Sequence, residues 1–240
     1  MLHKLKQDLD NLKNPEKAVV LSSFFKTSKG QYGEGDVFLG ITVPDQRKIA
    51  RKYLFLNLGD LKNLLENNIH EYRLTALLIL VEKFKNSSHF FDEDFSKKDS
   101  KEIVNFYLKN IKYINNWDLV DLTAPNILGE YLIKRNKNIL YELAKSNNLW
   151  ERRISMIATY AFIKKCDFKD ALEIAKILLE DTHDLIHKAV GWMLREIGKK
   201  DIKTEIDFLN KHYKEMPRTS LRYAIEKFNE EKRKFYLTKK

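Results

Sequence analysis

A chain of 240 residues, 43% hydrophobic and 32% charged, is long enough to bury the core of one large domain or two small ones. Its single cysteine, Cys166, excludes an intrachain disulfide, and no apolar run approaches the roughly 18 residues that a membrane span needs. The first residues lack the apolar stretch of a signal peptide, so we expect a cytoplasmic protein. The net charge of +10 favours a polyanionic partner, although solvated lysine-rich faces would give the same excess.

Helix signals recur along the chain, whereas no convincing alternating strand pattern is present. Asn14 is placed to cap a helix that has Pro15 at its first position, and Val43-Pro44 does much the same for the next helix. Apolar residues at the 3–4 spacing of a helix follow in four stretches: Leu61, Leu64 and Leu65; Leu74, Leu77, Leu78 and Val81; Ile154, Ile157 and Ala161; and Ala171, Ile174 and Leu178. The sequence therefore predicts an all-α fold.

Residues 26–40 differ from the rest of the chain, because they hold four of its eight glycines. They fit neither a Walker A loop, since no Gly-Lys-Ser/Thr follows Gly30, nor a dinucleotide fingerprint, since the third glycine is absent at the required spacing. Two interpretations stay open: a flexible basic loop that touches nucleic acid, or an ordered cap on the first repeat.

The predicted helices come in pairs, and the second helix of each pair resembles the others. Its first turn carries a charged residue before a small or apolar packing surface, as at Arg73, Asp121, Arg153, Lys188 and Arg222, spaced by 48, 32, 35 and 34 residues. This is the period of helix-pair repeats such as HEAT units, which stack into a curved solenoid. We therefore expect a single HEAT-like domain over residues 1–240, with the second helices lining a concave basic groove.

Basic side chains are disfavoured electrostatically at a helix N-terminus, which already carries a partial positive charge. Their recurrence in these first turns needs a reason, and a row of phosphate contacts along the groove supplies one better than simple solvation of the helix ends does. On this basis Arg152, Lys188, Arg218 and Arg222 are candidate nucleic-acid contacts.

The three tryptophans, Trp117, Trp150 and Trp192, lie at the starts of these helices or one turn into them. Tryptophan is usually a core residue, and this interpretation suits Trp150. Trp117 and Asp121 are four residues apart and share one helix face, where a ring beside a carboxylate suits a cationic ligand. The alternative is an ion pair between Asp121 and Arg153, and the residues alone leave both open.

Several motifs, taken in chain order, resemble those of the AlkD-type DNA alkylation repair glycosylases, a family built from HEAT-like repeats. The most specific are Asn-Trp-Asp-Leu-Val-Asp at 116–121 and Gly-Trp-Met-Leu-Arg-Glu at 191–196; the others are at 14–18, 39–47 and 149–153. The similarity covers nearly the whole chain.

The resemblance implies excision of cationic N3- and N7-alkylpurines from duplex DNA, at a shallow groove without an evident base pocket. We also expect a monomer without a cofactor, and no metal site, because the histidines form no ligand-spaced cluster with Cys166. It makes Asp121 the catalytic carboxylate and Trp117 and Trp192 the pair that embraces the deoxyribose of the lesion. Arg153 matches an arginine that binds the backbone, Arg195 is a further groove contact, and Phe24 stands where family members can carry a tyrosine.

Two other functions remain possible from the sequence. A non-catalytic DNA- or RNA-binding solenoid could retain the same residues for recognition, and helical repeats commonly act as protein-interaction scaffolds. An acid within a basic groove argues against the scaffold, which needs none. The sequence does not separate the enzyme from the non-catalytic binder.

Overall fold

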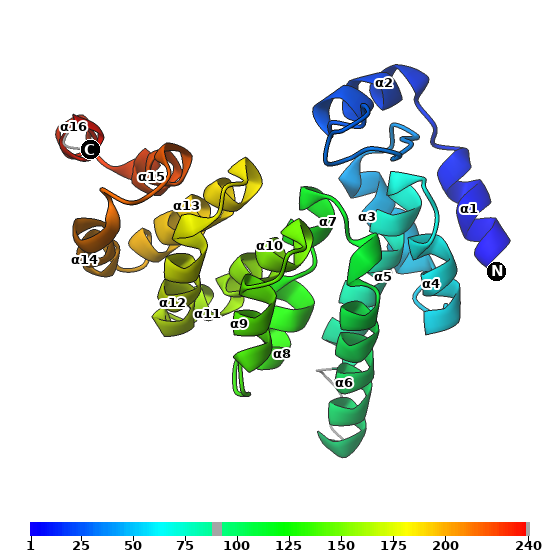
Figure 1. Cartoon of the computed structure of the whole chain (residues 1–240). Helices are drawn as coiled ribbons and strands as arrows, with labels where there is room; N and C mark the ends of the chain where they lie inside the picture. Colours follow the sequence, from blue (N-terminus) through cyan, green and yellow to red (C-terminus); the bar gives the residue numbers. More distant parts are fainter. Residues whose placement is uncertain (88–92, 239–240) are drawn as a thin grey trace. The chain divides into compact units, whose positions relative to one another are not determined.

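The computed structural model describes residues 1–87 and 93–238, and Figure 1 shows a chain built of helices. The one extended pairing within these ranges is an isolated parallel bridge between Val37 and Ile69. The predicted all-α fold is therefore confirmed. No helix in the part of the chain that the structure describes is long and apolar enough to cross a membrane.

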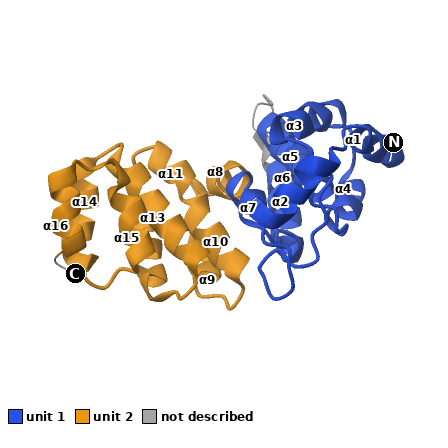
Figure 2. Ribbon diagram, turned by 90° about the horizontal axis from the view of Figure 1, so that it is seen from above, with its two compact units in different colours: residues 1–123 blue, residues 124–240 orange. Residues whose placement is uncertain are grey.

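The helices form two compact units, residues 1–123 and residues 124–240, coloured separately in Figure 2. The single domain expected over residues 1–240 stays a prediction. The helices of the first unit are α1 (Leu2–Asp10), α2 (Pro15–Phe24), α3 (Val43–Lys52), α4 (Leu58–Leu65), α5 (His70–Ser87), α6 (Glu93–Lys109) and α7 (Trp117–Asp121).

The predicted helix starts of the first unit are set by local capping. α2 begins at Pro15, and the side chain of Asn14 accepts a hydrogen bond from the amide of Lys17 at 2.9 Å. α3 begins at Val43, one residue earlier than the Pro44 start expected from the sequence, because Thr42 is the residue that caps it. Both helices thus have proline in the first turn, where its missing N–H costs nothing.

Helix α5 is the centre of the first unit, packed against α3, α4 and α6. Every residue from His70 to Val81 is buried, so the helix has no solvent-facing side over three turns. Among its buried side chains are His70, Glu71 and Arg73, which are 2%, 1% and 4% exposed. Charged groups at this depth need partners, and the partners come from residues 26–40 and from α7.

Residues 26–40 cover the start of α5, whereas a contact of this segment with nucleic acid stays a prediction. The carboxylate of Glu71 accepts hydrogen bonds from the amides of Leu39, Gly40 and Ile41 at 2.9, 2.8 and 3.2 Å. Gly40 has φ +85°, and a Cβ there would lie 2.1 Å from the carbonyl oxygen of Asn14, so only glycine fits.

The second unit consists of successive helix pairs, seen side by side in orange in Figure 2. Its helices are α8 (Glu130–Leu132), α9 (Asn138–Ala144), α10 (Leu149–Ala158), α11 (Tyr160–Lys164), α12 (Lys169–Ile177), α13 (Asp184–Gly198), α14 (Ile202–His212), α15 (Arg218–Ala224) and α16 (Glu230–Thr238).

The second helices of the pairs in this unit are α10, α13 and α15, and α13 packs against both of the others. They carry Arg153, Lys188 and Arg222, but Arg222 lies in the last turn of α15 and not in the first turn that the repeat pattern predicts. A Cβ on Gly191 would lie 2.4 Å from the carbonyl oxygen of Ser220. The close approach of α13 to α15 at this point therefore requires glycine. Trp150 is buried at 8% exposure, in line with its predicted packing role.

Candidate functional site

The short helix α7 carries Trp117 and Asp121, two of the three candidate site residues of the first unit; the third is Phe24. The side chain of Asn116 caps its start, accepting a hydrogen bond from the amide of Trp117 at 2.8 Å. Trp117 and Asp121 are both half-buried, and their spacing of four residues places them on one side of the helix. A helix of five residues has little stability of its own, so its position depends on tertiary contacts.

Aromatic side chains from α2 and the residue after it hold the ring of Trp117. Phe25 stacks on Trp117 with ring centroids 5.1 Å apart and planes 13° apart, and Phe24 meets the same ring edge-on at 5.8 Å. Phe24 is 59% exposed, whereas Phe25 is buried. The structure thus brings together two residues, Phe24 and Trp117, that the sequence analysis singled out for separate reasons.

Asp121 is the last residue of α7 and lies near the fully buried Tyr107 of α6. Burial is the main cause that raises the pKa of the Tyr107 hydroxyl, and the negative charge of Asp121 raises it further. Asp121 belongs to the first unit and Arg153 to the second. An ion pair between them stays a prediction, as does the cation-binding role.

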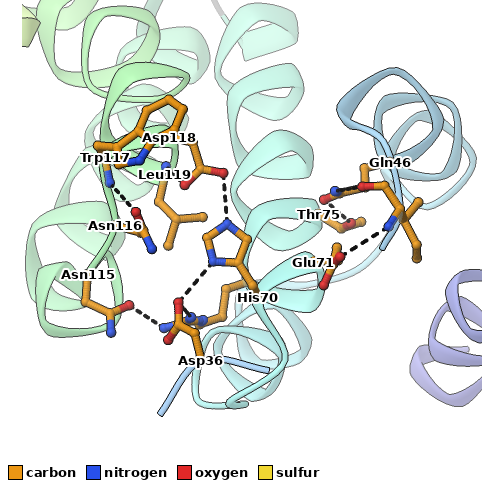
Figure 3. A network of polar contacts seen from close by, with 12 residues as sticks. Asp36, Gln46, His70, Glu71, Thr75, Asn115, Asn116, Trp117, Asp118 and Leu119 are labelled. Carbon is orange, nitrogen blue, oxygen red and sulfur yellow. Dashed lines mark hydrogen bonds and ion pairs between the residues drawn. The ribbon is translucent and has the colours of Figure 1, made fainter. Parts of the chain in front are cut away.

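A buried polar cluster that the sequence analysis missed lies directly behind the start of α7, and Figure 3 shows it from close by. His70 stands between two carboxylates: its Nδ1 is 3.1 Å from Asp36 and its Nε2 is 2.8 Å from Asp118. Arg73 forms an ion pair with Asp36 at 2.5 Å and donates a hydrogen bond to the side chain of Asn115. The cluster joins residues 26–40, α5 and the segment that leads into α7.

The electrostatics of this cluster favour its charged forms. Burial alone would lower the pKa of His70, but the Asp118 and Asp36 carboxylates outweigh it and raise that pKa to about 9. Burial alone would likewise raise the pKa of Asp36, but the hydrogen bond from His70 and the charge of Arg73 hold it below its usual value. Arg73 is buried and its charge pairs with Asp36. It therefore does not belong to the row of phosphate contacts predicted from the first turns of the second helices.

A cavity of about 530 Å³ lies between α2 and the α3–α5 face of the first unit. Its walls are mostly apolar, with Phe24, Phe25 and Phe38 among the lining rings. His70, Glu71, Gln46 and Asp118 also reach it, and each of them hydrogen-bonds elsewhere in the unit: His70 with Asp118, Glu71 with the amide of Leu39, and Gln46 with the carbonyl of Ile41. Such a cavity could not be predicted from the sequence, because its lining comes from separate segments.

In the second unit Trp192 lies on α13, one helical turn after Lys188. Its indole N–H donates a hydrogen bond to Glu196 at 3.1 Å, and its ring centroid is 6.2 Å from that of Tyr160. Glu196 also accepts from Lys199 at 2.6 Å. The ring of Trp192 is therefore held in one orientation by a neighbour one turn further along the helix.

The predicted basic contacts all lie on α10, α13 and α15, and most of them are engaged within the second unit. Arg153 is only 4% exposed and donates to the carbonyl of Leu185, which ties α10 to the first turn of α13. Arg222 is exposed. The remaining pairings are Arg152 with Asp181 at 2.5 Å, Lys188 with Asp184 at 2.7 Å, Arg195 with Glu226, and Arg218 with the carbonyl of Leu237 at 2.8 Å.

The residues missed by sequence reasoning are Asp36 and His70, with Asp118 noticed only as a neighbour of Trp117. One signal could have found His70: it precedes an apolar run long enough to be a fully buried helix, together with Glu71 and Arg73. Charged residues on a buried turn must be paired, so partners elsewhere in the chain could have been sought. Among the described residues no group of three or more His, Cys, Asp or Glu side chains could hold a metal ion.

Comparisons with known proteins complete the description of the site. A family model described as DNA alkylation repair enzyme matches residues 5–228. The structure is similar to a solved structure titled as a predicted DNA alkylation repair enzyme from Enterococcus faecalis, with a TM-score of 0.62, 15% identity and coverage of 91% of this chain and 97% of that one. The protein smu.31 from Streptococcus mutans UA159 is similar with a TM-score of 0.56, 20% identity and coverage of 76% and 90%. No curated protein matches the sequence. At these identities the two structures establish a shared helical-repeat fold.

Proposed function

Because the chain belongs to the DNA alkylation repair enzyme family, we propose that it is a monofunctional DNA glycosylase that removes N3- and N7-alkylated purines from duplex DNA by hydrolysing the N-glycosidic bond. The observation that carries the proposal is the pairing of Trp117 and Asp121 on one short helix, within the family match and with Phe24 packed on the indole. Alkylated duplex DNA is then the substrate and the partner.

The chemistry of the lesion explains why a carboxylate beside an aromatic ring is sufficient. Alkylation at N3 or N7 makes the purine a cation and hence a good leaving group, so no general acid is required. Cleavage of the glycosidic bond builds oxocarbenium charge on the sugar, and a fixed anion stabilises this charge. We assign this role to Asp121, which also positions the attacking water.

The aromatic and basic residues bind and orient the DNA in this proposal. Trp117 and Trp192 embrace the deoxyribose, where their π faces add to the stabilisation of positive charge. Phe24, which is exposed beside Trp117, supplies an apolar contact without the hydroxyl that a tyrosine would bring. Arg195, Lys188, Arg152, Arg218 and Arg222 contact phosphates, and Arg153 binds the backbone beside the lesion.

The deciding experiment measures release of 7-methylguanine and 3-methyladenine from methylated duplex DNA. We expect release by the wild type and a loss of about 100-fold or more in Asp121→Asn, because the variant keeps the shape of the side chain but removes its charge. Asp207→Asn, the same change at an exposed position of α14, is the matched control and should leave the rate unchanged.

Binding of the methylated duplex is measured in parallel, because it separates the enzyme from its alternative. A wild-type protein that binds the duplex and releases no base is the non-catalytic DNA- or RNA-binding protein that the sequence left open. An Asp121→Asn variant as active as the wild type would remove Asp121 from the mechanism.

A further inference from the structure

We propose that His70 is a positioning residue of the Asp121 site, which bridges residues 26–40 and α7 and thereby fixes the orientation of Trp117 and Asp121. The catalytic part of this inference rests on the proposed function. The structural part does not, because it concerns the position of α7 in the protein alone.

The geometry around His70 requires a donor at both of its ring nitrogens. Nδ1 faces the carboxylate of Asp36 at 3.1 Å and Nε2 faces that of Asp118 at 2.8 Å, and His70 is 2% exposed, so water does not replace either partner. A neutral imidazole carries one N–H and can satisfy one carboxylate, whereas the imidazolium satisfies both. Loss of the proton therefore removes the hydrogen bond from His70 to one of the two carboxylates, and the bridge opens on that side, although Asp36 keeps Arg73 and Asp118 keeps the amide of Leu119.

The charges that face His70 balance only when it is protonated. Asp36 and Asp118 contribute two negative charges, and Arg73, paired with Asp36, contributes one positive charge. Glu71, the next residue of α5, is turned to the backbone, where its carboxylate accepts hydrogen bonds from the amides of residues 39–41. The pKa of His70 is raised to about 9, in agreement with this balance, so the bridge is closed at neutral pH.

The bridge reaches the site residues by two routes. Through the chain, Asp118 follows Trp117 directly, and its second oxygen accepts the amide of Leu119 at 2.9 Å, so His70 holds the first turn of α7. Through space, the ring of Phe25 lies between His70 and Trp117, with centroid distances of 5.1 Å to each. Because α7 has only five residues, these contacts determine where Trp117 and Asp121 point.

The first test needs no DNA. The protein contains three tryptophans, Trp117, Trp150 and Trp192, so incorporation of 5-fluorotryptophan gives three ¹⁹F resonances that Trp→Phe variants assign. In a titration from pH 6 to pH 10 we expect the Trp117 resonance to shift with a midpoint near the pKa of His70, and those of Trp150 and Trp192 to stay. A Trp117 resonance that does not change over this range would overturn the proposal.

Two variants establish which group the Trp117 resonance reports. In His70→Gln the titration of Trp117 should disappear. In Asp36→Asn, which keeps the shape of the contact but removes one charge, the midpoint should move to lower pH by about one unit or more. His212→Gln, a change of a half-buried histidine in the second unit, is the matched control. If His70→Gln does not fold, the titrations of the wild type and of Asp36→Asn still test the proposal. A midpoint of the Trp117 titration that is the same in both proteins would contradict the bridge.

The second test concerns the reaction. We expect His70→Gln to lower kcat for alkylpurine release about 10- to 100-fold with the KM for methylated duplex little changed, because a displaced carboxylate impairs the transition state and not the binding of phosphates. The wild-type rate should fall above pH 9, and this alkaline limb should be absent in His70→Gln. An unchanged kcat in a folded variant would refute the positioning role, while an inactive wild type with a normal ¹⁹F titration would refute the proposed function alone.

Discussion

The two units each bury a titratable side chain at 2% exposure, and they treat it in opposite ways. His70 in the first unit lies between two carboxylates and is held in its charged form. Glu205 on α14 of the second unit has one buried oxygen without a hydrogen-bond partner, packs against Gly198, and has its pKa raised to about 8 by burial. A buried charge thus persists where partners converge on it and is neutralised where they do not.

The two units also differ in how many side chains meet at the buried charge. Four side chains from three segments converge on the start of α7, which carries Trp117 and Asp121, and this arrangement costs desolvation of every charge involved. Glu205 has no comparable set of partners, and Arg195, the one charge that lowers its pKa, does not outweigh burial. If partners decide the charge state of a buried group, removing a partner should cost more stability in the first unit than in the second.

Arg73→Met should destabilise the first unit most. The substitution keeps much of the side-chain volume but removes the cation paired with Asp36, leaving a buried carboxylate that only His70 partners. Breaking one side of a buried pair typically costs about 3–5 kcal/mol of the free energy of unfolding. Urea denaturation at pH 7 measures this loss, and a loss below about 1 kcal/mol would mean that the cluster contributes little to stability.

The pH dependence of stability should show the contribution of His70 at the alkaline side. Its pKa is about 9 in the folded protein against 6.5 when unfolded, so its stabilisation is complete below pH 6.5 and is lost as the pH rises through 9. The shift corresponds to about 3 kcal/mol. Denaturation at pH 6.5 and pH 9.5 measures the change in the free energy of unfolding. We expect this free energy to fall with pH in the wild type and to fall much less in His70→Gln; equal falls would place the titrating group elsewhere.

Glu205→Gln should stabilise the second unit near neutral pH. A carboxyl with a raised folded-state pKa stabilises fully below the unfolded value of 4.5 and loses that stabilisation as the pH rises through about 8, so the wild type is at a disadvantage at pH 8. The amide of the variant does not titrate, so we expect the free energy of unfolding to rise by about 1–2 kcal/mol. The rise is limited because the amide is itself incompletely hydrogen-bonded. Thermal unfolding at pH 8 and pH 4 tests this, and a gain that is equal at both values would contradict the mechanism.

How far the sequence predicted these features follows from the range of the interactions. The start of α2, the start of α3 to within one residue, and the second helices α10, α13 and α15 could be predicted, because caps, proline and apolar spacing are local signals. The Trp117 and Asp121 motif was visible for the same reason. The bridge of His70 was not, since Asp118 is 48 residues away and their meeting depends on the packing of α5 against α7.

Arg73 shows the same limit from the other side. Its position in the first turn of a second helix suggested a phosphate contact, but in the structure that turn is covered by residues 26–40 and the charge is used for Asp36. The prediction of the helix was correct, whereas periodicity alone does not show which part of the protein the first turn of this helix faces. A loop of irregular sequence decided whether the turn is buried.

Lys164→Met gives the smallest expected effect and serves as the control for Arg73→Met. Lys164 and Glu130 form an ion pair at 3.1 Å in the second unit, with side chains 39% and 35% exposed. Water and salt screen such a pair, and holding two long side chains together costs entropy, so we expect a change below about 1 kcal/mol that shrinks further in 0.5–1 M salt, on the order of what exposed pairs give. The loss in Arg73→Met should persist in salt, because the partners of Arg73 are shielded from solvent. If both losses were similar and both faded with salt, burial would not be what distinguishes the His70 cluster from an ordinary surface pair, and its role in holding α7 would lose its physical basis.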